Sequence, residues 1–165
     1  MACDFKSKFK LIKFLRKGNF SEIFKCADRK TGQQFACKLI KGRRNNRRFI
    51  KYELPNARLC DYRHIYKIHE CFYDKTNEET HIVTELGNGD VMDYIETYNL
   101  NIYEKINIIR QMTLAVNYIQ TKGIYHGDIK LENFIYRRHI RSDSIDIDYL
   151  TENVKNEFTV KLIDF

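Results

Sequence analysis

Residues 124–135 gather side chains that could carry out proton and phosphate chemistry. Five polar residues stand there between apolar positions: His126, Asp128, Lys130, Glu132 and Asn133. A helix-like pattern ends at Gly123 and a short strand is expected to follow, so a loop held at both ends by core elements should present them. A carboxylate beside a lysine and an amide can accept a proton, neutralise anionic charge and bind a hard metal ion through oxygen. This combination favours phosphoryl transfer over hydrolysis by a Ser or Cys nucleophile.

The elements expected before this loop are mostly strands. Apolar alternation and intervening turns predict five strands, at residues 9–15, 23–27, 34–40, 65–73 and 80–86. In the third strand Lys38 would share one face with Ala36 and Ile40. A lysine inside an apolar strand is more often an edge residue whose charged end reaches solvent than a functional group. Helical character at residues 45–60 follows, and Pro55 should shorten or distort that helix.

The elements expected around and after the loop are mostly helices. Residues 87–89 read Gly-Asn-Gly, a flexible junction that predicts two units, 1–86 and 87–165. A short helix near residues 91–95 and a longer one at about 103–122 should follow, with a broad apolar face on the longer helix. That face comprises Ile108, Met112, Ala115 and Ile119, widened by Ile109 and Val116. Short strands at 134–136 and 158–163 should flank a polar surface insertion at 137–157. The expected fold class is therefore α+β, with the polar loop near a cleft between two lobes.

Composition limits the class of protein. A hydrophobic content of 43% supports a packed core, and a net charge of +7 fits an anionic ligand, an acidic partner or nucleic acid. Residues 41–51 hold much of the basic charge, and a solvated surface is the simpler interpretation of that cluster. The five cysteines lack metal-type spacing and are expected to be free thiols in a reducing compartment. With a polar N-terminus and no apolar run near 18 residues, we expect a soluble cytoplasmic protein, with nuclear access open and no membrane contact.

Four segments, in the right order, resemble the motifs of eukaryotic protein kinases. His126-Gly-Asp128-Ile-Lys130-Leu-Glu-Asn133 is similar to the catalytic loop, and Phe35-Ala36-Cys37-Lys38 to the third-strand lysine motif. Leu15-Arg-Lys-Gly18-Asn-Phe20-Ser-Glu-Ile23 resembles the glycine-rich loop, and Lys161-Leu-Ile-Asp164-Phe165 the approach to Asp-Phe-Gly. The resemblance spans residues 9–165. It implies a two-lobed kinase-like fold, with a five-stranded antiparallel N-lobe sheet, one helix and a partial helical C-lobe.

The resemblance also implies the chemistry and the residues that perform it. The activity would be transfer of the ATP γ-phosphate to a Ser or Thr hydroxyl of a protein substrate, because Lys130 is typical of Ser/Thr kinases. Asp128 would accept the hydroxyl proton and Lys130 would contact the transferred phosphoryl group. Asn133 and Asp164 would bind Mg²⁺. Lys38 would bind the α- and β-phosphates, with Glu53 as its orienting partner.

Further positions would bind the nucleotide by the same resemblance. Leu15 and Gly18 belong to the loop over the phosphates, and Ile23 and Ala36 would cover one face of the base, with Ile135 on the other. Glu85 and Gly87 would offer backbone groups to adenine. Asp90 matches the ribose position and Thr84 the residue that limits the back of the pocket, although strand-end and helix-cap roles explain these two equally well without the resemblance.

Departures from the family pattern leave alternatives open. Arg16 and Ser21 replace glycines of the phosphate loop, and Arg16 could restrict the loop or reach the nucleotide. Gly127 replaces the usual Arg before the catalytic Asp, and the sequence stops at Phe165, so we expect a fragment of a longer kinase or a truncated form. One alternative function is an inactive kinase-like module that binds or mimics another kinase. Nucleic-acid binding through residues 41–51 is less favoured, because Phe49 is the only aromatic residue in that cluster.

Overall fold

The computed structural model describes residues 4–18, 21–138 and 158–164. Five antiparallel strands form the first sheet, in the order β1-β2-β3-β5-β4. Their bounds are Phe9–Lys17 (β1), Ser21–Asp28 (β2), Gln34–Lys41 (β3), Ile68–Asp74 (β4) and Glu79–Thr84 (β5). A short helix, α1 (Phe5–Lys8), precedes β1, and Asp4 caps it by accepting the Lys6 N–H. The expected five-stranded antiparallel sheet is confirmed.

Each face of this sheet buries its own apolar cluster. Phe5, Phe9, Cys26, Phe35, Cys37 and Val83 pack together on one face. Ile40, Phe49, Leu54 and Ile82 pack on the other face, under the helical segment that follows β3. The alternation predicted for the third strand is thus confirmed, because Cys37 and Ile40 belong to opposite clusters.

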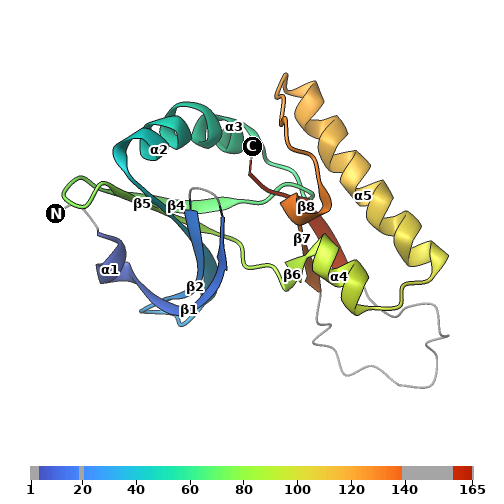
Figure 1. Cartoon of the computed structure of the whole chain (residues 1–165), viewed down its shortest axis with the longest axis horizontal. Coiled ribbons are helices and arrows are strands. Elements are labelled where there is room, and N and C mark those ends of the chain that lie inside the picture. Colours follow the sequence, from blue (N-terminus) through green and yellow to red (C-terminus); the bar gives the residue numbers. More distant parts are fainter. Residues whose placement is uncertain (1–3, 19–20, 139–157, 165) are drawn as a thin grey trace.

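The helical segment after β3 is continuous but irregular. It comprises α2 (Arg43–Arg48), a π-helical turn at Phe49–Glu53 and α3 (Leu54–Leu59), lying over the sheet in Figure 1. Pro55 stands in the first turn of α3, where its missing N–H is tolerated, and the Leu54 N–H bonds back to Phe49 O. The distortion expected from Pro55 is therefore a π-helical turn rather than a break.

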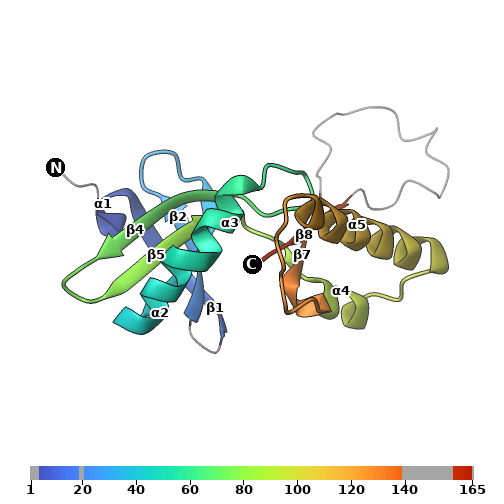
Figure 2. The same cartoon turned by 90° about the horizontal axis from the view of Figure 1, so that it is seen from above.

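The second half of the chain is built on a small sheet and one long helix. Strands β6 (Gly89–Asp90), β7 (Phe134–Arg138) and β8 (Phe158–Leu162) pair in that order. Helix α4 (Val91–Thr97) follows β6, and the long helix α5 (Ile102–Thr121) packs against β8 (Figures 1 and 2). Asn101 and Glu104 form a reciprocal capping box at the start of α5. A short 3-10 turn, Leu131–Asn133, leads into β7.

The structure corrects two sequence-based predictions, and the first concerns the start of the fourth strand. Residues 65–67 were predicted to begin the fourth strand, yet β4 begins at Ile68. Ile65 makes an isolated parallel bridge to Leu162, and both side chains lie in the large core with Phe134 and Val160. This local apolar run therefore connects the first sheet to the second half of the chain instead of extending β4.

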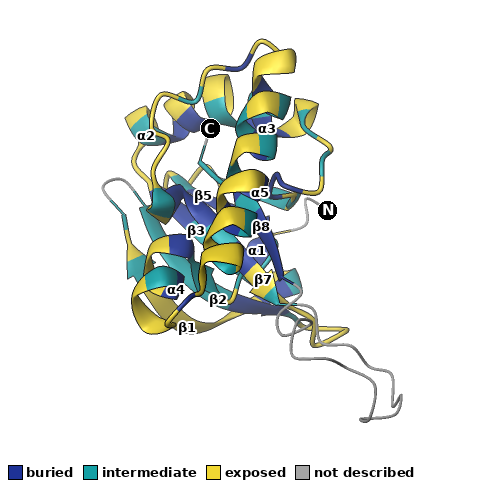
Figure 3. Ribbon diagram, turned by 90° about the vertical axis from the view of Figure 1, so that its right-hand side faces the viewer, coloured by how far each residue is buried: buried dark blue, intermediate teal, exposed yellow. Residues whose placement is uncertain are grey.

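The buried face of α5 also differs from the prediction. Ile108, Ala115 and Ile119 are buried as expected, but Ile109 is 62% exposed. Gln111 is buried in its stead, and its Oε1 accepts the Val160 N–H at 2.9 Å. A helical face is set by what it packs on, and the open edge of β8 offers a backbone group that only a polar side chain can satisfy. Figure 3 shows α5 with buried and exposed residues on opposite sides.

Two remaining expectations concern parts of the chain that are only partly described. Arg137 and Arg138 end β7, and the rest of the predicted insertion, 139–157, lies outside the described residues. Phe165 lies outside them as well. Within the described residues no helix has both the length and the apolar character needed to cross a membrane. The division into units 1–86 and 87–165 stays a prediction.

Candidate active site

Lys38 lies between two carboxylates from distant parts of the chain. Its Nζ is 2.8 Å from Asp164 Oδ1 and 3.4 Å from Glu53 Oε2. Burial by itself would lower the pKa of Lys38, but the attraction of Asp164 and Glu53 outweighs it and raises that pKa. Lys38 is therefore held as a cation in a largely buried position. The expected pairing with Glu53 is present in spite of Pro55, and Asp164 is the nearer partner.

The catalytic-loop residues form one hydrogen-bonded group. Asn133 Nδ2 donates to Asp128 Oδ2 at 2.9 Å and to Asp128 O at 2.7 Å. Lys130 Nζ lies 2.8 Å from the same Asp128 Oδ2. Hydrogen bonds from Lys130 and then Asn133 lower the pKa of Asp128, so its carboxylate stays ionised near neutral pH. Asp128 and Lys130 are both exposed.

His126 connects this loop to Asp164, a role that the sequence analysis did not assign. Its Nε2 donates to Ile163 O at 2.8 Å, and its Nδ1 accepts the Asp128 N–H at 3.2 Å. The carbonyl partner fixes the proton on Nε2, which leaves Nδ1 as the acceptor. His126 therefore aligns the backbone of Asp128 with the residue that precedes Asp164. Its place two residues before Asp128 was the only signal in the sequence.

Asn133 and Asp164 are neighbours whose oxygens suit Mg²⁺. The Ile163 N–H donates to Asn133 O at 2.9 Å. This bond places Asn133 beside the residue that directly precedes Asp164. Asp164 has a φ of 58°, a left-handed conformation that asparagine and aspartate tolerate better than most residues. Because the amide nitrogen of Asn133 is bound to Asp128, its Oδ1 points away from that residue. One amide oxygen and one carboxylate form a donor set that fits a hard cation also held by phosphate oxygens.

Four predicted residues share one face of the first sheet. Directly opposed residues in antiparallel strands point to the same side, and Ile23 opposes Lys38 while Ala36 opposes Thr84. Residues 36 and 38 are two apart on β3, so Ile23, Ala36, Lys38 and Thr84 face one way. Thr84 is buried, as expected for a residue at the back of a pocket. Ile23 and Ala36, which were expected to cover one face of a base, thus lie on the same face of the sheet as Lys38.

The junction after β5 packs closely on β7. A side chain at Gly87 would place its Cβ 3.0 Å from Ile135 Cβ, so glycine is needed for the two segments to approach. The Glu85 side chain accepts from Lys161 Nζ at 2.9 Å, and the Glu85 N–H donates to Lys67 O. The Glu85 carbonyl accepts from the Thr84 hydroxyl at 3.4 Å, and Gly87 packs against Ile135. The flexible junction expected at residues 87–89 is instead a tight contact.

Asp90 binds a residue of the predicted phosphate loop, a contact that the sequence analysis did not predict. Asp90 Oδ1 accepts the Asp93 N–H at 2.9 Å, capping α4, and its Oδ2 accepts from Arg16 Nη1 at 2.9 Å. Asp90 thus has the cap role and also a contact with the first sheet. Leu15, in the same strand as Arg16, is 43% exposed. The Gly18 N–H donates to Ser21 O at 2.8 Å, closing the loop, while residues 19 and 20 lie outside the description.

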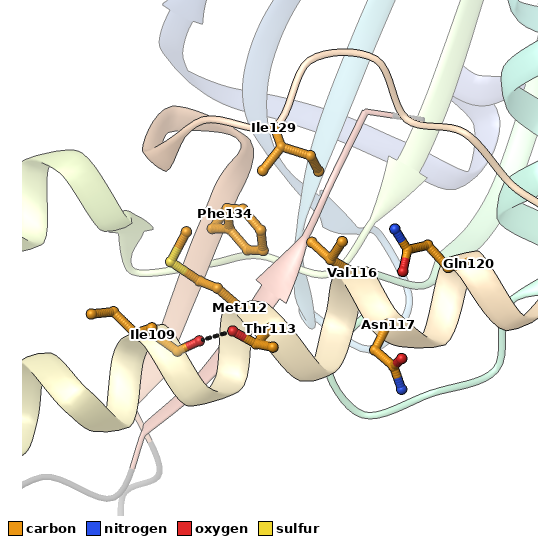
Figure 4. A pocket seen from close by; sticks show the side chains of 8 residues that line it. All are labelled: Ile109, Met112, Thr113, Val116, Asn117, Gln120, Ile129 and Phe134. Atoms are coloured by element: carbon orange, nitrogen blue, oxygen red, sulfur yellow. Dashed lines mark hydrogen bonds between the residues drawn. The ribbon is translucent and has the colours of Figure 1, made fainter.

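Two surfaces lie outside this group. The arginines of residues 41–51 are exposed on α2: Arg43, Arg44, Arg47 and Arg48. Below the catalytic loop is an open apolar pocket of about 370 Å³, where Met112 and Val116 of α5 point toward Ile129 and Phe134 (Figure 4). Ile129 follows Asp128 directly, so one wall of the pocket is the back of the catalytic loop.

Comparison with known proteins agrees with this geometry. The family model for the protein kinase domain matches residues 9–165. Calcium-dependent protein kinase 5 of Plasmodium berghei is 34% identical over 137 residues, which cover 81% of this chain and 24% of that protein. The probable serine/threonine-protein kinase zyg-1 of Caenorhabditis briggsae is 30% identical over 161 residues, covering 96% of this chain and 20% of that protein. CBL-interacting serine/threonine-protein kinase 1 of Arabidopsis thaliana is 28% identical over 158 residues, which cover 91% of this chain and 35% of that protein. The chain thus spans between a fifth and about a third of the length of these relatives.

Proposed function

The chain belongs to the protein kinase family, and from that premise we propose that it binds ATP and Mg²⁺ and serves Ser/Thr phosphorylation. The whole protein would transfer the γ-phosphate to a Ser or Thr hydroxyl of a protein substrate. The relatives named as serine/threonine kinases support this substrate class. The observation that carries the proposal is Lys38, a half-buried cation shared by Glu53, 15 residues away, and Asp164, 126 residues away.

In this proposal the residues divide the work of holding and orienting the reactants. Lys38 would bind the α- and β-phosphates of ATP, with Glu53 fixing its position. Bound Mg²⁺, held by Asn133 and Asp164, would neutralise charge on the phosphate oxygens. Asp128, kept ionised by its donors, would orient the substrate hydroxyl and accept its proton.

The remaining residues would place the phosphoryl group and the adenine ring. Lys130, already beside Asp128, would move toward the transferred phosphoryl group and offset its charge. Ile23, Ala36 and Ile135 would enclose the adenine ring, and the backbone at Glu85 and Gly87 would bind its edge. Leu15 and Gly18 would cover the ATP from the side of β1.

Phosphate transfer by the complete protein tests the proposal. Lys38→Met and Asp128→Asn should each lower transfer to a general protein substrate by about 100-fold or more. Lys41→Met and Asp61→Asn are matched controls on exposed side chains, and both should keep the activity within about two-fold. Unchanged transfer in Lys38→Met and Asp128→Asn would refute the proposal.

The open pocket in Figure 4 favours a second candidate function, in which the chain binds another protein kinase without catalysing transfer. Ile109 and Ile129 at the pocket are 62% and 47% exposed, an unusual amount for large apolar residues on neighbouring elements. The chain should then change the activity of a purified Ser/Thr kinase even with Asp128→Asn in place. Ile109→Glu should abolish that effect, and Ile102→Glu, equally exposed on the same helix, should not. No effect on any kinase tested would rule the module out.

A further inference from the structure

Arg16 joins the first sheet to the second half of the chain through its contact with Asp90. Its Nη1 lies 2.9 Å from Asp90 Oδ2, although 74 residues separate the two in sequence. Arg16 belongs to β1, whereas Asp90 ends β6 and caps α4. The Asp90 side chain is 11% exposed and the Arg16 side chain 41%, so the pair stands at the edge of the interior.

A local irregularity in β1 directs Arg16 toward Asp90. Phe14 opposes Phe24 on β2 and Arg16 opposes Ile23, so Leu15 is an extra residue on β1. A β-bulge of this kind bends the strand and re-aims the side chains next to it. The positive charge of Arg16 also reaches Lys130, where it opposes the rise in pKa caused by Asp128. Arg16 thus lies near both the helix cap at Asp90 and the catalytic loop.

The Asp90 carboxylate has both oxygens engaged. Oδ1 accepts the Asp93 N–H, a bond that begins α4, and Oδ2 accepts from the Arg16 guanidinium. Of these two bonds, the cap is part of the fold, whereas the bond to Arg16 depends on a long side chain that can leave. A hydroxyl pair that approaches Asp90 therefore meets one oxygen that caps α4 and another, Oδ2, that is ion-paired with the Arg16 guanidinium.

We propose that Arg16 competes with the ribose hydroxyls for Asp90 and thereby lowers the affinity of this site for nucleosides. This rests on the proposed function, because it takes a bound nucleotide to place its ribose at Asp90, the ribose position that the resemblance to protein kinases implies. The competition is specific to ligands with a ribose 2′- or 3′-hydroxyl, because a sugar that lacks these two hydroxyls has no group to donate to Asp90. Arg16 is then a specificity-determining residue that replaces the glycine usual at its position.

Calorimetric titration of this chain with adenosine and with 2′,3′-dideoxyadenosine tests the competition. Both probes lack phosphates, so attraction between Arg16 and phosphate oxygens does not enter. Arg16→Gln should bind adenosine about two- to five-fold more tightly than wild type, the range expected from a partly exposed ion pair. Its affinity for 2′,3′-dideoxyadenosine should stay unchanged. Lys13→Gln, the same charge loss at an exposed position on β1, should alter neither affinity.

A second background isolates Asp90 itself. Asp90→Asn removes the charge and keeps a residue that caps helices as well as aspartate does, so α4 should remain intact. In that background Arg16→Gln should give no gain in adenosine affinity, because the competing pair no longer exists. A gain that persists there would overturn the proposal.

The other outcomes separate this inference from the proposed function. Adenosine affinity that is unchanged or weaker in Arg16→Gln overturns the competition alone, provided that wild type binds ATP. An equal gain for both nucleosides also overturns it, because Arg16 would then obstruct entry regardless of the sugar. If no variant binds adenosine or ATP, both the inference and the proposed function fail.

Discussion

Replacing Lys38 by methionine removes a positive charge that pairs with two carboxylates in the candidate active site. The Lys38 side chain is 18% exposed, and those of Glu53 and Asp164 are 24% and 34% exposed. Removing one partner of a fully buried pair costs about 3–5 kcal/mol, whereas exposed pairs contribute about 0.2–1 kcal/mol. Water reaches both carboxylates here, so we expect Lys38→Met to lower the free energy of unfolding by about 1.5–3 kcal/mol.

Urea unfolding followed by circular dichroism measures this loss, and β3 offers a matched control. Lys41 Nζ pairs with Glu22 Oε2 at 2.9 Å, as close as Lys38 to Asp164, but the Lys41 side chain is 55% exposed. Lys41→Met should therefore leave the unfolding midpoint unchanged, while Lys38→Met should lower it by about 1 M urea. Equal midpoints for the two variants would refute the reasoning that burial gives the Lys38 pairs their strength.

The pH dependence of the Lys38→Met variant shows whether the lost charge or the lost packing of Lys38 causes the destabilisation. The two carboxylates raise the pKa of Lys38, so the stability that its charge contributes is present below the ordinary value of 10.5 and is lost as the pH rises through the raised pKa of the folded state. The stability gap between Lys38→Met and wild type should therefore narrow as the pH rises above 10.5. A gap that stays constant there would mean that the lost alkyl packing of Lys38, and not the charge, causes the destabilisation. The same variant should bind a fluorescent ATP analogue at least about ten-fold more weakly.

Three further outcomes follow from single buried or strained positions. Gln111→Leu removes the acceptor of the buried Val160 N–H and should lower the free energy of unfolding by about 1–3 kcal/mol, against no change for the exposed Gln120→Leu. Burial lowers the pKa of His64 below 6.5, so the folded state resists its protonation and stability is lost as the pH falls below that value. His64→Asn should flatten the decline of the thermal midpoint between about pH 6.5 and 5; an equally steep decline would contradict this sign. Gly127 has a φ of 79°, so Gly127→Val should destabilise the chain by about 1 kcal/mol more than Gly127→Asn, and equal thermal midpoints would count against it.

Local patterns in the sequence predicted most elements because they record burial on one face at a time. Period-two alternation around Lys38 gave the correct faces of β3, which bury separate clusters. The same reasoning failed at Ile65, whose apolar side chain belongs to the core of the second half rather than to β4. Periodicity reports that a residue is buried, and it does not report which element covers it.

In the candidate site, too, contacts within one loop could be predicted from the sequence, whereas contacts between distant segments could not. Residue types and order placed Asp128, Lys130 and Asn133 on one loop, and the loop is short enough that their mutual hydrogen bonds follow from proximity. Contacts between distant segments carried no such signal. His126 bonds to Ile163 across 37 residues, and no pattern near His126 indicated that partner.

The sequence by itself determined which residues could handle phosphate, because short motifs keep reactive groups at fixed spacings along the chain. Only the tertiary structure decided how those groups meet. Lys38 reaches Asp164 across 126 residues, and Arg16 reaches Asp90 across 74. Both pairs depend on how the first sheet sits against β6, β7 and β8, which is set by the packing of the whole core. Side-chain partners at such separations are fixed by that packing, and neither spacing nor periodicity encodes it.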